Sequence, residues 1–385
     1  MCRVFGKFFF GKTDHRFTAF LMRIKALFGI SMIIFAQLIN WAFLLLDEIF
    51  YRKYHDIEIE KPVFILGPPR SGTTFLHRLM AKDERFSCIK LWEIMFAPSI
   101  IQKKFCLFLG RLDKRIGNKL SNVIIHLEKK DRLLSNPIHK MNFFEPEEDE
   151  WLLFSACATG HFFLLWFPFF KILHPLIYFD KELPKVERER IMTFYKHCVQ
   201  RHLYVFGKDK LFLSKNPAFS TKIRSIHQAF PDAKIIFLAR NPLDSVPSLL
   251  SLYSFTFNEF SPAFNHTEAM AFGVQQMLDY YTYPLHELEH WPINRKAIVV
   301  YNQLVHDPTK TVKNVYRQLE LELTPEYAET LSKEDAKAKH FRSKHEYSLD
   351  QFGLTPQDIK NRFHEIFDRF GFEQKMGESA DDFEG

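Results

Sequence analysis

Short apolar runs alternate along the chain with longer segments of helical periodicity. Four runs are rich in Val, Ile, Leu and Phe, as is typical of strands buried on both faces: Pro62–Leu66, Leu211–Leu213, Lys234–Ala239 and Ala297–Tyr301. Four segments show helical periodicity: Thr73–Lys82, Ala218–Ala229, Leu243–Tyr253 and Thr309–Leu319. Strands that alternate with helices predict βαβ units, and hence an α/β fold with a mostly parallel central sheet covered by helices.

The regions outside this alternation differ in character. Residues from about 95 to 205 carry helical and aromatic patterns with little strand signal, which predicts a helical insertion between core strands. The pattern is again helical from about residue 322, and the chain ends in an acidic tail. We therefore predict an N-terminal apolar helical segment at residues 1–60, a principal domain at 61–376 and the acidic tail at 377–385.

The N-terminal segment contains an uncharged run, residues 26–46, that is long enough to span a bilayer as a helix. Basic residues precede it, and Asp47 and Glu48 follow it. The run is too long for a signal peptide, and no small-residue cleavage site follows. Gln37 and Asn40 weaken the spanning interpretation. A spanning helix, a helix in the membrane interface and a helix packed on the domain all remain open, so the protein is either cytoplasmic or membrane-associated.

Composition excludes several classes of protein. The chain is 46% hydrophobic and 25% charged, close to an average globular protein, which argues against disorder, collagen and a polytopic membrane protein. The net charge of +6 indicates an anionic ligand or surface without requiring nucleic acid. The five cysteines are scattered, and their spacing indicates neither a disulfide framework nor a zinc site.

The most specific motif is the glycine loop, residues 67–74, with the sequence Gly-Pro-Pro-Arg-Ser-Gly-Thr-Thr between a predicted strand and a predicted helix. Its two glycines, Gly67 and Gly72, allow backbone N–H groups to turn toward a phosphate at the start of the helix. The spacing matches the nucleotide loop of phosphoryl-transfer proteins, but Thr73 stands where the phosphate-binding Lys is expected. Arg70 supplies the cation instead. The alternative is an ordinary glycine-rich turn.

A second predicted anion site follows the strand Lys234–Ala239. Arg240 comes directly after this strand, at the edge where α/β sheets bind ligands, and Ser248 lies in the opening turns of the next helix. Helix capping by Asn241 or Asp244 would explain part of this segment. Neither this strand nor the last one ends in the Asp that a magnesium-dependent NTPase uses, so a ligand with several phosphates and no essential metal fits better.

Together the two elements resemble those of the sulfotransferases that use 3'-phosphoadenosine 5'-phosphosulfate (PAPS). The resemblance runs from about Pro62 to Gly353 and is strongest to the branch with tyrosylprotein and bacterial enzymes. It implies a three-layer fold like that of P-loop NTPases, with 61–376 as the catalytic domain. It also implies that Arg240 and Ser248 bind the 3'-phosphate and that Tyr301 packs near the nucleotide. The 5' end would be held by five residues of the glycine loop: Arg70, Ser71, Gly72, Thr73 and Thr74.

The transfer itself needs a base and a cation near the moving group. Glu93, a little over twenty residues after the glycine loop, is the candidate base, because the resembled branch has a Glu at similar spacing. A surface carboxylate, or a partner for Lys90, is the alternative for Glu93. Lys215, at the end of a predicted strand, is the candidate cation for the transferring oxygens, against a solvated loop lysine. Other members of the family use His as base, so His77 and His139 are second choices.

Three further segments have weaker interpretations. The acidic cluster 145–150 admits a metal site, but we prefer carboxylates in the first turns of a helix, where the helix dipole favours them. A zinc site at His197, Cys198 and His202 is disfavoured, because the first would point away from the other two on a helix. Lys344 is a candidate phosphate contact from a C-terminal segment that covers the nucleotide.

The sequence thus predicts transfer of a sulfuryl group from PAPS, with PAP as the product, to a hydroxyl or amine acceptor without a metal. The acceptor is a small molecule, lipid or glycan, and no nucleic acid is expected. The uncharged, aromatic segment Trp151–Phe170 favours an apolar, lipid-like acceptor. A P-loop kinase or NTPase, and a noncatalytic membrane-associated nucleotide-binding protein, are the alternatives. Residues 26–46 provide a possible membrane contact.

Overall fold

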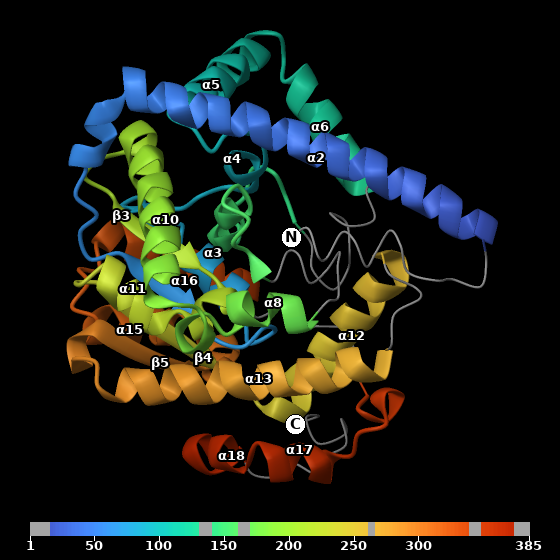
Figure 1. Ribbon diagram of the computed structural model, residues 1–385. Coiled ribbons are helices and arrows are strands. Elements are labelled where there is room, and N and C mark those ends of the chain that lie inside the picture. The colour runs from blue at the N-terminus through green and yellow to red at the C-terminus, as the bar shows by residue number, and fades with distance from the viewer. Residues whose placement is uncertain (1–15, 131–140, 161–169, 261–265, 339–347, 373–385) are drawn as a thin grey trace.

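The computed structural model describes residues 16–130, 141–160, 170–260, 266–338 and 348–372 (Figure 1). The predicted acidic tail, His139 and Lys344 lie outside these residues.

The core is a five-stranded sheet in the order β2-β3-β1-β4-β5, and every pair of neighbouring strands is parallel. The strands are β1 (Val63–Leu66), β2 (Phe86–Ser87), β3 (Leu211–Lys215), β4 (Lys234–Ala239) and β5 (Lys296–Val300). The four predicted strands are confirmed with shifts of at most two residues at their ends, whereas the two-residue strand β2 was not predicted. Because β1 lies between β3 and β4, the segments that follow these three strands meet at one edge of the sheet.

Helices cover both faces of the sheet, as the predicted three-layer α/β fold requires. Alternate residues of β1 enter different cores: Phe64 lies in one cluster of buried side chains and Ile65 in the other. The first cluster is formed with α10 (Lys185–Phe206), α11 (Ile223–Ala229), α12 (Pro242–Phe260) and α13 (His266–Glu289). The second is formed with α3 (Thr73–Met80), α14 (Tyr301–His306), α15 (Pro308–Gln318) and α16 (Pro325–Ala338). The C-terminal η5 (Asp350–Phe352), α17 (Pro356–Arg362) and α18 (His364–Phe370) are helical, as expected.

In the described part of residues 95–205, every regular element is helical. These elements are α5 (Ile100–Arg115), α6 (Lys119–Lys130), η2 (Asp149–Phe154), α8 (Phe170–Ile177), α9 (Phe179–Glu182) and α10. They are preceded by η1 (Arg52–Asp56) and α4 (Leu91–Phe96). The predicted helix 218–229 is divided into η3 (Pro217–Thr221) and α11, and η4 (Ile293–Arg295) precedes β5.

The predicted N-terminal run lies within one long helix, α2 (Arg16–Phe50), which crosses over α5 in Figure 1. Its stretch Ser31–Phe50 is the only part of a described helix that is long and apolar enough to span a membrane, with a mean hydropathy of 1.7.

Candidate functional site

The glycine loop leaves the central strand β1 and leads into α3. Both of its glycines have a left-handed backbone, with φ of 143° at Gly67 and 91° at Gly72. A Cβ atom at Gly67 would lie 2.5 Å from the carbonyl oxygen of Leu238, and one at Gly72 would lie 2.6 Å from Cδ2 of Tyr301. Arg70 also has a positive φ, of 69°. The loop is therefore shaped by close contact with β4 and α14, and a non-glycine residue in the left-handed region indicates a functional position.

The structure brings the glycine loop and the second predicted anion site together. Nε of Arg70 donates to Oγ of Ser248 at 3.0 Å, and Nη1 of Arg240 donates to the backbone carbonyl oxygen of Arg70 at 2.9 Å. The guanidinium of Arg240 lies over the ring of Tyr301, 4.3 Å from its centroid. These four residues, Arg70, Arg240, Ser248 and Tyr301, form what we call the arginine cluster. Two guanidiniums at adjacent strand ends create a strongly positive site for an anion.

Two buried polar atoms at this site make no hydrogen bond within the described structure. They are Oγ of the buried Ser71 and Nε of Arg240, whose approach to the carboxylate of Asp244 is a longer 3.7 Å. Thr73 is buried and Thr74 is half-buried in the first turn of α3. Buried donors without partners are costly unless a ligand satisfies them. Hydroxyl groups, guanidiniums and a helix N-terminus are together a donor set that fits a phosphate or sulfate group.

Lys215 lies at the carboxyl end of β3, beside the glycine loop. Its side chain is completely buried, and Nζ lies 3.0 Å from Oε1 of Glu148 and 3.2 Å from Oε1 of Glu147. Burial alone would lower the pKa of Lys215, but the attraction of the two carboxylates outweighs it and raises that pKa above its ordinary value. The alternative of a solvated loop lysine is therefore wrong. The lysine is a fixed positive charge in the interior.

The acidic cluster pairs with the end of β3 and the residues after it. Asp149 accepts hydrogen bonds from Oγ of Ser214 at 2.8 Å and from the hydroxyl of Tyr195 at 2.6 Å. Burial raises the pKa of Asp149 to about 7 and outweighs these hydrogen bonds, which would lower it. Glu150 lies 3.4 Å from Nζ of the buried Lys222. Asp149 and Glu150 do occupy the first turn of η2, but the helix-dipole interpretation is insufficient, because their partners are side chains of other elements. No group of three or more potential metal ligands is found among the described residues, and independence from metal remains a prediction.

Glu93 lies in the first turn of α4, and only 1% of it is exposed. Its Oε2 lies 2.7 Å from Nδ1 of His202 and 3.9 Å from Nζ of Lys103, and its Oε1 accepts the backbone N–H of Lys90 at 3.1 Å. Burial would raise the pKa of Glu93, but His202 and then Lys103 outweigh it and lower that pKa. Glu93 is therefore not a surface carboxylate, and its neighbours favour its charged form. The described contacts do not join it to the arginine cluster, and its role as base remains a prediction.

His77, the second choice as base, is buried on α3. Burial, and then the charge of Lys215, lower its pKa to about 3. An imidazole with so low a pKa accepts a proton poorly, so the environment of His77 does not favour this role.

Sequence reasoning missed the partners of both candidate catalytic residues. The pairing of Lys215 with the acidic cluster was signalled by two dense polar segments in an otherwise apolar region, Glu145–Glu150 and Ser214–Asn216. The pair of Glu93 and His202 had no such signal, because it joins helices 109 residues apart in the chain.

Comparison with known proteins adds independent information. A protein-family model described as the sulfotransferase family matches residues 62–325. Omega-hydroxy-beta-dihydromenaquinone-9 sulfotransferase Stf3 of Mycobacterium bovis is 23% identical over 338 residues, which cover 83% of this chain and 78% of that protein, and the Mycobacterium tuberculosis protein of the same name gives the same values.

Two solved structures share the fold. Sulfotransferase STF9 from Mycobacterium avium has a TM-score of 0.69 at 21% identity, covering 86% of this chain and 82% of that one. Sulfotransferase STF1 from Mycobacterium tuberculosis has a TM-score of 0.68 at 19% identity, covering 94% of this chain and 90% of that one.

Proposed function

Because the chain belongs to the sulfotransferase family, we propose that it transfers a sulfuryl group from PAPS to a hydroxyl or amine group of an apolar acceptor. The observation that carries the choice of donor is the direct contact between the two anion-binding elements, from Arg240 to the backbone of Arg70 and from Arg70 to Ser248. PAPS carries anionic groups at both the 3' and 5' positions of one adenosine. A site in which two arginine-bearing elements touch each other suits such a ligand better than a nucleotide charged at one end.

In the proposed complex, the 5'-phosphosulfate lies in the glycine loop against the N-terminus of α3, where Ser71, Gly72, Thr73 and Thr74 supply donors. Arg240 and Ser248 hold the 3'-phosphate. The ring of Tyr301 packs against the guanidinium of Arg240 and holds it in position. Lys344 is retained only as a candidate contact outside the described residues.

The proposed chemical step is an in-line displacement. A bond forms between the acceptor oxygen and sulfur, the bond from sulfur to the 5'-phosphate oxygen breaks, and PAP leaves. The acceptor proton passes to a carboxylate, and the leaving oxygen receives charge stabilisation from Lys215. Glu93 is the proposed base because of its spacing from the glycine loop; its lowered pKa does not favour proton uptake. Glu148 is a second candidate, because its side chain is partly exposed and contacts Lys215 directly.

The acceptor is proposed to be lipid-like with a hydroxyl group. The mycobacterial relatives are named for an omega-hydroxy menaquinone, and the uncharged segment Trp151–Phe170 offers apolar side chains, although residues 161–169 lie outside the described structure. Transfer from radiolabelled PAPS to a long-chain primary alcohol should therefore exceed transfer to a water-soluble phenol.

Thermal-shift titration with PAP and with AMP, in buffer containing EDTA, tests the donor site. Arg240→Ala should weaken PAP binding about 10- to 100-fold, because a hydrogen bond to a charged group contributes about 1.5–3 kcal/mol. AMP lacks the 3'-phosphate, so its binding should change little. Arg224→Ala is the matched control, since this arginine pairs with Glu287 outside the cluster.

A native protein that ignores PAP would contradict the proposed donor. Magnesium-dependent ATP hydrolysis would instead support the kinase or NTPase alternative. Normal PAP binding without transfer to any acceptor would support a noncatalytic nucleotide-binding protein.

A further inference from the structure

Helix α2 is amphipathic, but its polar side faces the domain and its apolar side faces outward. A helix on a water-facing surface has the opposite orientation. In α2, the polar side chains Asn40 and Asp47 are buried against the domain, and Gln37 is half-buried. Most of its large apolar side chains are exposed, although Leu44 is buried and Trp41 donates to the carbonyl oxygen of Ser155. The exposed ones are Met32, Ile33, Ile34, Phe35, Leu38, Ile39, Trp41, Leu45, Ile49 and Phe50. A helix in water normally presents the opposite arrangement, so these side chains call for an apolar partner that the described residues do not supply.

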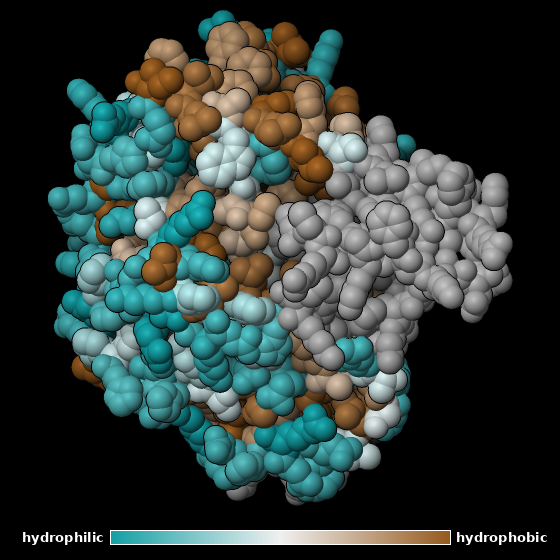
Figure 2. All heavy atoms as spheres, in the orientation of Figure 1, coloured by the Kyte–Doolittle hydropathy of each residue, from teal (hydrophilic) through white to brown (hydrophobic). Residues whose placement is uncertain are grey.

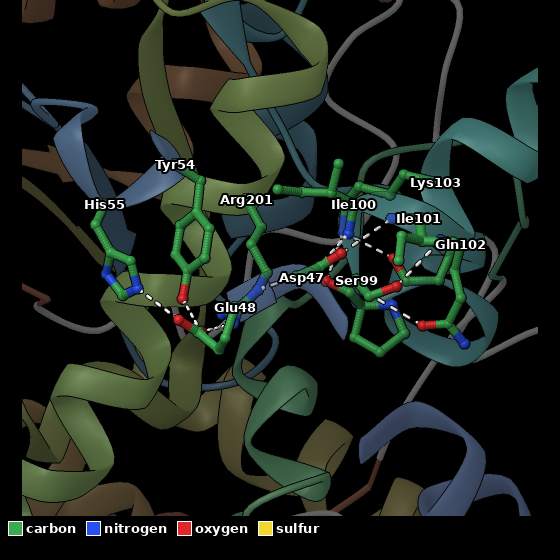
Figure 3. A network of polar contacts seen from close by, with 12 residues as sticks. Asp47, Glu48, Tyr54, His55, Ser99, Ile100, Ile101, Gln102, Lys103 and Arg201 are labelled. Atoms are coloured by element: carbon green, nitrogen blue, oxygen red, sulfur yellow. Dashed lines mark hydrogen bonds and ion pairs between the residues drawn. The ribbon is translucent and has the colours of Figure 1, made fainter. Parts of the chain in front are cut away.

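Polar contacts fix this orientation. The carboxylate of Asp47 accepts the backbone N–H groups of Ile100 and Ile101, at 2.7 and 3.2 Å, and so caps the start of α5 (Figure 3). Arg201 of α10 donates to Asp47 at 3.2 Å and to Glu48 at 2.6 Å. Rotating α2 to bury its apolar side chains would break the buried pair of Asp47 and Arg201, which is strongly unfavourable. The outward apolar stripe is therefore a fixed feature of the fold.

The stripe continues over neighbouring helices. Exposed apolar side chains also come from α4, α5, α6 and the segment before η2: Met95, Phe96, Phe105, Leu107, Phe108, Leu112, Ile116, Leu120, Val123, Leu127 and Phe144. We call these residues, with those of α2, the outer face. Figure 2 shows hydrophobic side chains gathered at the top of the molecule, where Figure 1 places α2 and α5. Water-soluble monomers rarely expose so extensive an apolar surface.

The exposed charges on the α5 and α6 part of the outer face have one sign. Between residues 100 and 130, all of which the structure describes, every exposed charged side chain is basic: Lys104, Arg111, Lys114, Arg115, Lys119, Lys129 and Lys130. The two acidic residues are turned inward. Asp113 caps the start of α6 through the backbone N–H groups of Leu120 and Ser121, and Glu128 accepts that of Phe143.

We propose that the outer face docks onto the surface of an anionic lipid bilayer, entering one leaflet without crossing it. Apolar side chains beside a basic rim are the pattern of an interfacial membrane anchor. A second copy of this chain is a poorer occupant, because a two-fold contact would bring the same cations together. A spanning α2 is disfavoured, because Asn40, Asp47 and Glu48 are bound to α5 and α10 along the second half of the candidate span.

The outer face also leads toward the candidate site. Phe144 lies just before the carboxylates that pair with Lys215, and α4 joins this segment through the antiparallel bridge of Lys90 and Pro146. A docked protein would thus have its candidate site next to the lipid phase. Delivery of the acceptor from the bilayer rests on the proposed function; docking itself does not.

Co-sedimentation of the full chain with vesicles tests the docking. We expect binding to phosphatidylcholine vesicles containing phosphatidylglycerol and weaker binding to phosphatidylcholine alone. Phe108→Glu with Leu112→Glu should reduce binding by roughly tenfold or more, since each inserted side chain loses apolar contact and adds a repelled charge. The matched control is Val186→Glu with Ile293→Glu, whose side chains are as exposed but lie outside the outer face. Lys114→Glu with Arg115→Glu should selectively weaken binding to the anionic vesicles, with Lys313→Glu as its control.

Several results would overturn the proposal. The first is failure of the protein to sediment with either kind of vesicle, and the second is an equal loss of vesicle binding in the control pair. The third is a dimer in solution that Phe108→Glu with Leu112→Glu converts to a monomer. The fourth is protein that stays on the vesicles after an alkaline carbonate wash, which indicates a spanning helix. Unchanged melting curves establish that each variant is folded. PAP binding is measured without vesicles on the same proteins, so failure of the donor assignment and failure of docking are separate outcomes.

Discussion

Nη1 of Arg240 donates to the backbone carbonyl oxygen of Arg70 at 2.9 Å, across the neighbouring strands β1 and β4. The contact joins a loop and a strand end that are 170 residues apart in the sequence. It depends on Tyr301, whose ring lies under the guanidinium of Arg240 and beside Gly72. A change in the glycine loop at Gly72 is therefore expected to move Tyr301 and, through it, the guanidinium of Arg240.

This link predicts that Gly72→Ala damages both stability and nucleotide binding. The new Cβ would lie 2.6 Å from the ring of Tyr301, so either the loop or the ring must move. The left-handed backbone adds about 1–2 kcal/mol to the cost. We expect a lower melting temperature and loss of the shift produced by PAP.

Gly117→Ala is the control for the backbone term alone. Gly117 has φ of 83°, but a Cβ there would have no atom within 4 Å. It should lower stability by the backbone term and leave PAP binding intact. If the two variants bind PAP equally well, the glycine loop does not form the nucleotide site.

The sequence was sufficient to predict the sheet and the meeting of the two anion-binding elements. Strands buried on both faces have continuous apolar runs, and parallel strands place their carboxyl ends at one edge, so Arg70 and Arg240 could be paired before their contact was seen. The strand β2 was missed because Phe86–Ser87 is too short to show a pattern.

Side-chain pairing was harder to predict than topology. Two examples are the contact between Glu93 and His202 and the attachment of Asp47 to α5, which both depend on how the helices of the insertion pack. Hydrophobic periodicity in the sequence does not indicate which side chains will pair. The helix expected at 218–229 is interrupted because Ser220 and Thr221 turn inward, to Gly67 and to the carbonyl oxygen of Ile177. Such tertiary hydrogen bonds override local helical preference.

Asp149 predicts a dependence of stability on pH. Burial raises its pKa to about 7 in the folded protein from an ordinary value of 3.8, so the folded state binds a proton that the unfolded state releases. Its contribution to stability is fully present below pH 3.8 and is lost as the pH rises through about 7.

Asp149→Asn mimics the protonated side chain. Urea unfolding gives the free energy of unfolding of both proteins at each pH. As the pH rises toward about 7, this free energy should fall for the native protein relative to the variant. Above about pH 7, the difference between the two proteins should stay constant. Curves that remain parallel at every pH would show that the carboxyl has the same pKa in the folded and unfolded states and would contradict the raised pKa.

Lys215 is expected to support both stability and transfer, and a triple variant separates the two. Lys215→Met leaves Glu147 and Glu148 in the interior without their cation, and breaking a buried pair costs about 3–5 kcal/mol. Lys215→Met combined with Glu147→Gln and Glu148→Gln removes the unpaired charges and should recover much of the melting temperature. Sulfuryl transfer should remain lost in both proteins, and Glu148→Gln alone measures how much of that loss comes from the second candidate base. Recovery of transfer together with stability would mean that Lys215 is a structural residue only.

Glu93→Gln tests the proposed base against Glu148→Gln. If Glu93 takes the acceptor proton, Glu93→Gln should lower kcat about 100-fold or more and remove the acidic limb of the pH profile, while PAP binding is retained. Its ion pair with His202 also supports packing, so a fall in melting temperature alone is not evidence of catalysis. His202→Gln provides the comparison, because it breaks the same pair and leaves the carboxylate in place. A normal kcat in Glu93→Gln with loss of the acidic limb in Glu148→Gln would assign the proton transfer to the carboxylate beside Lys215.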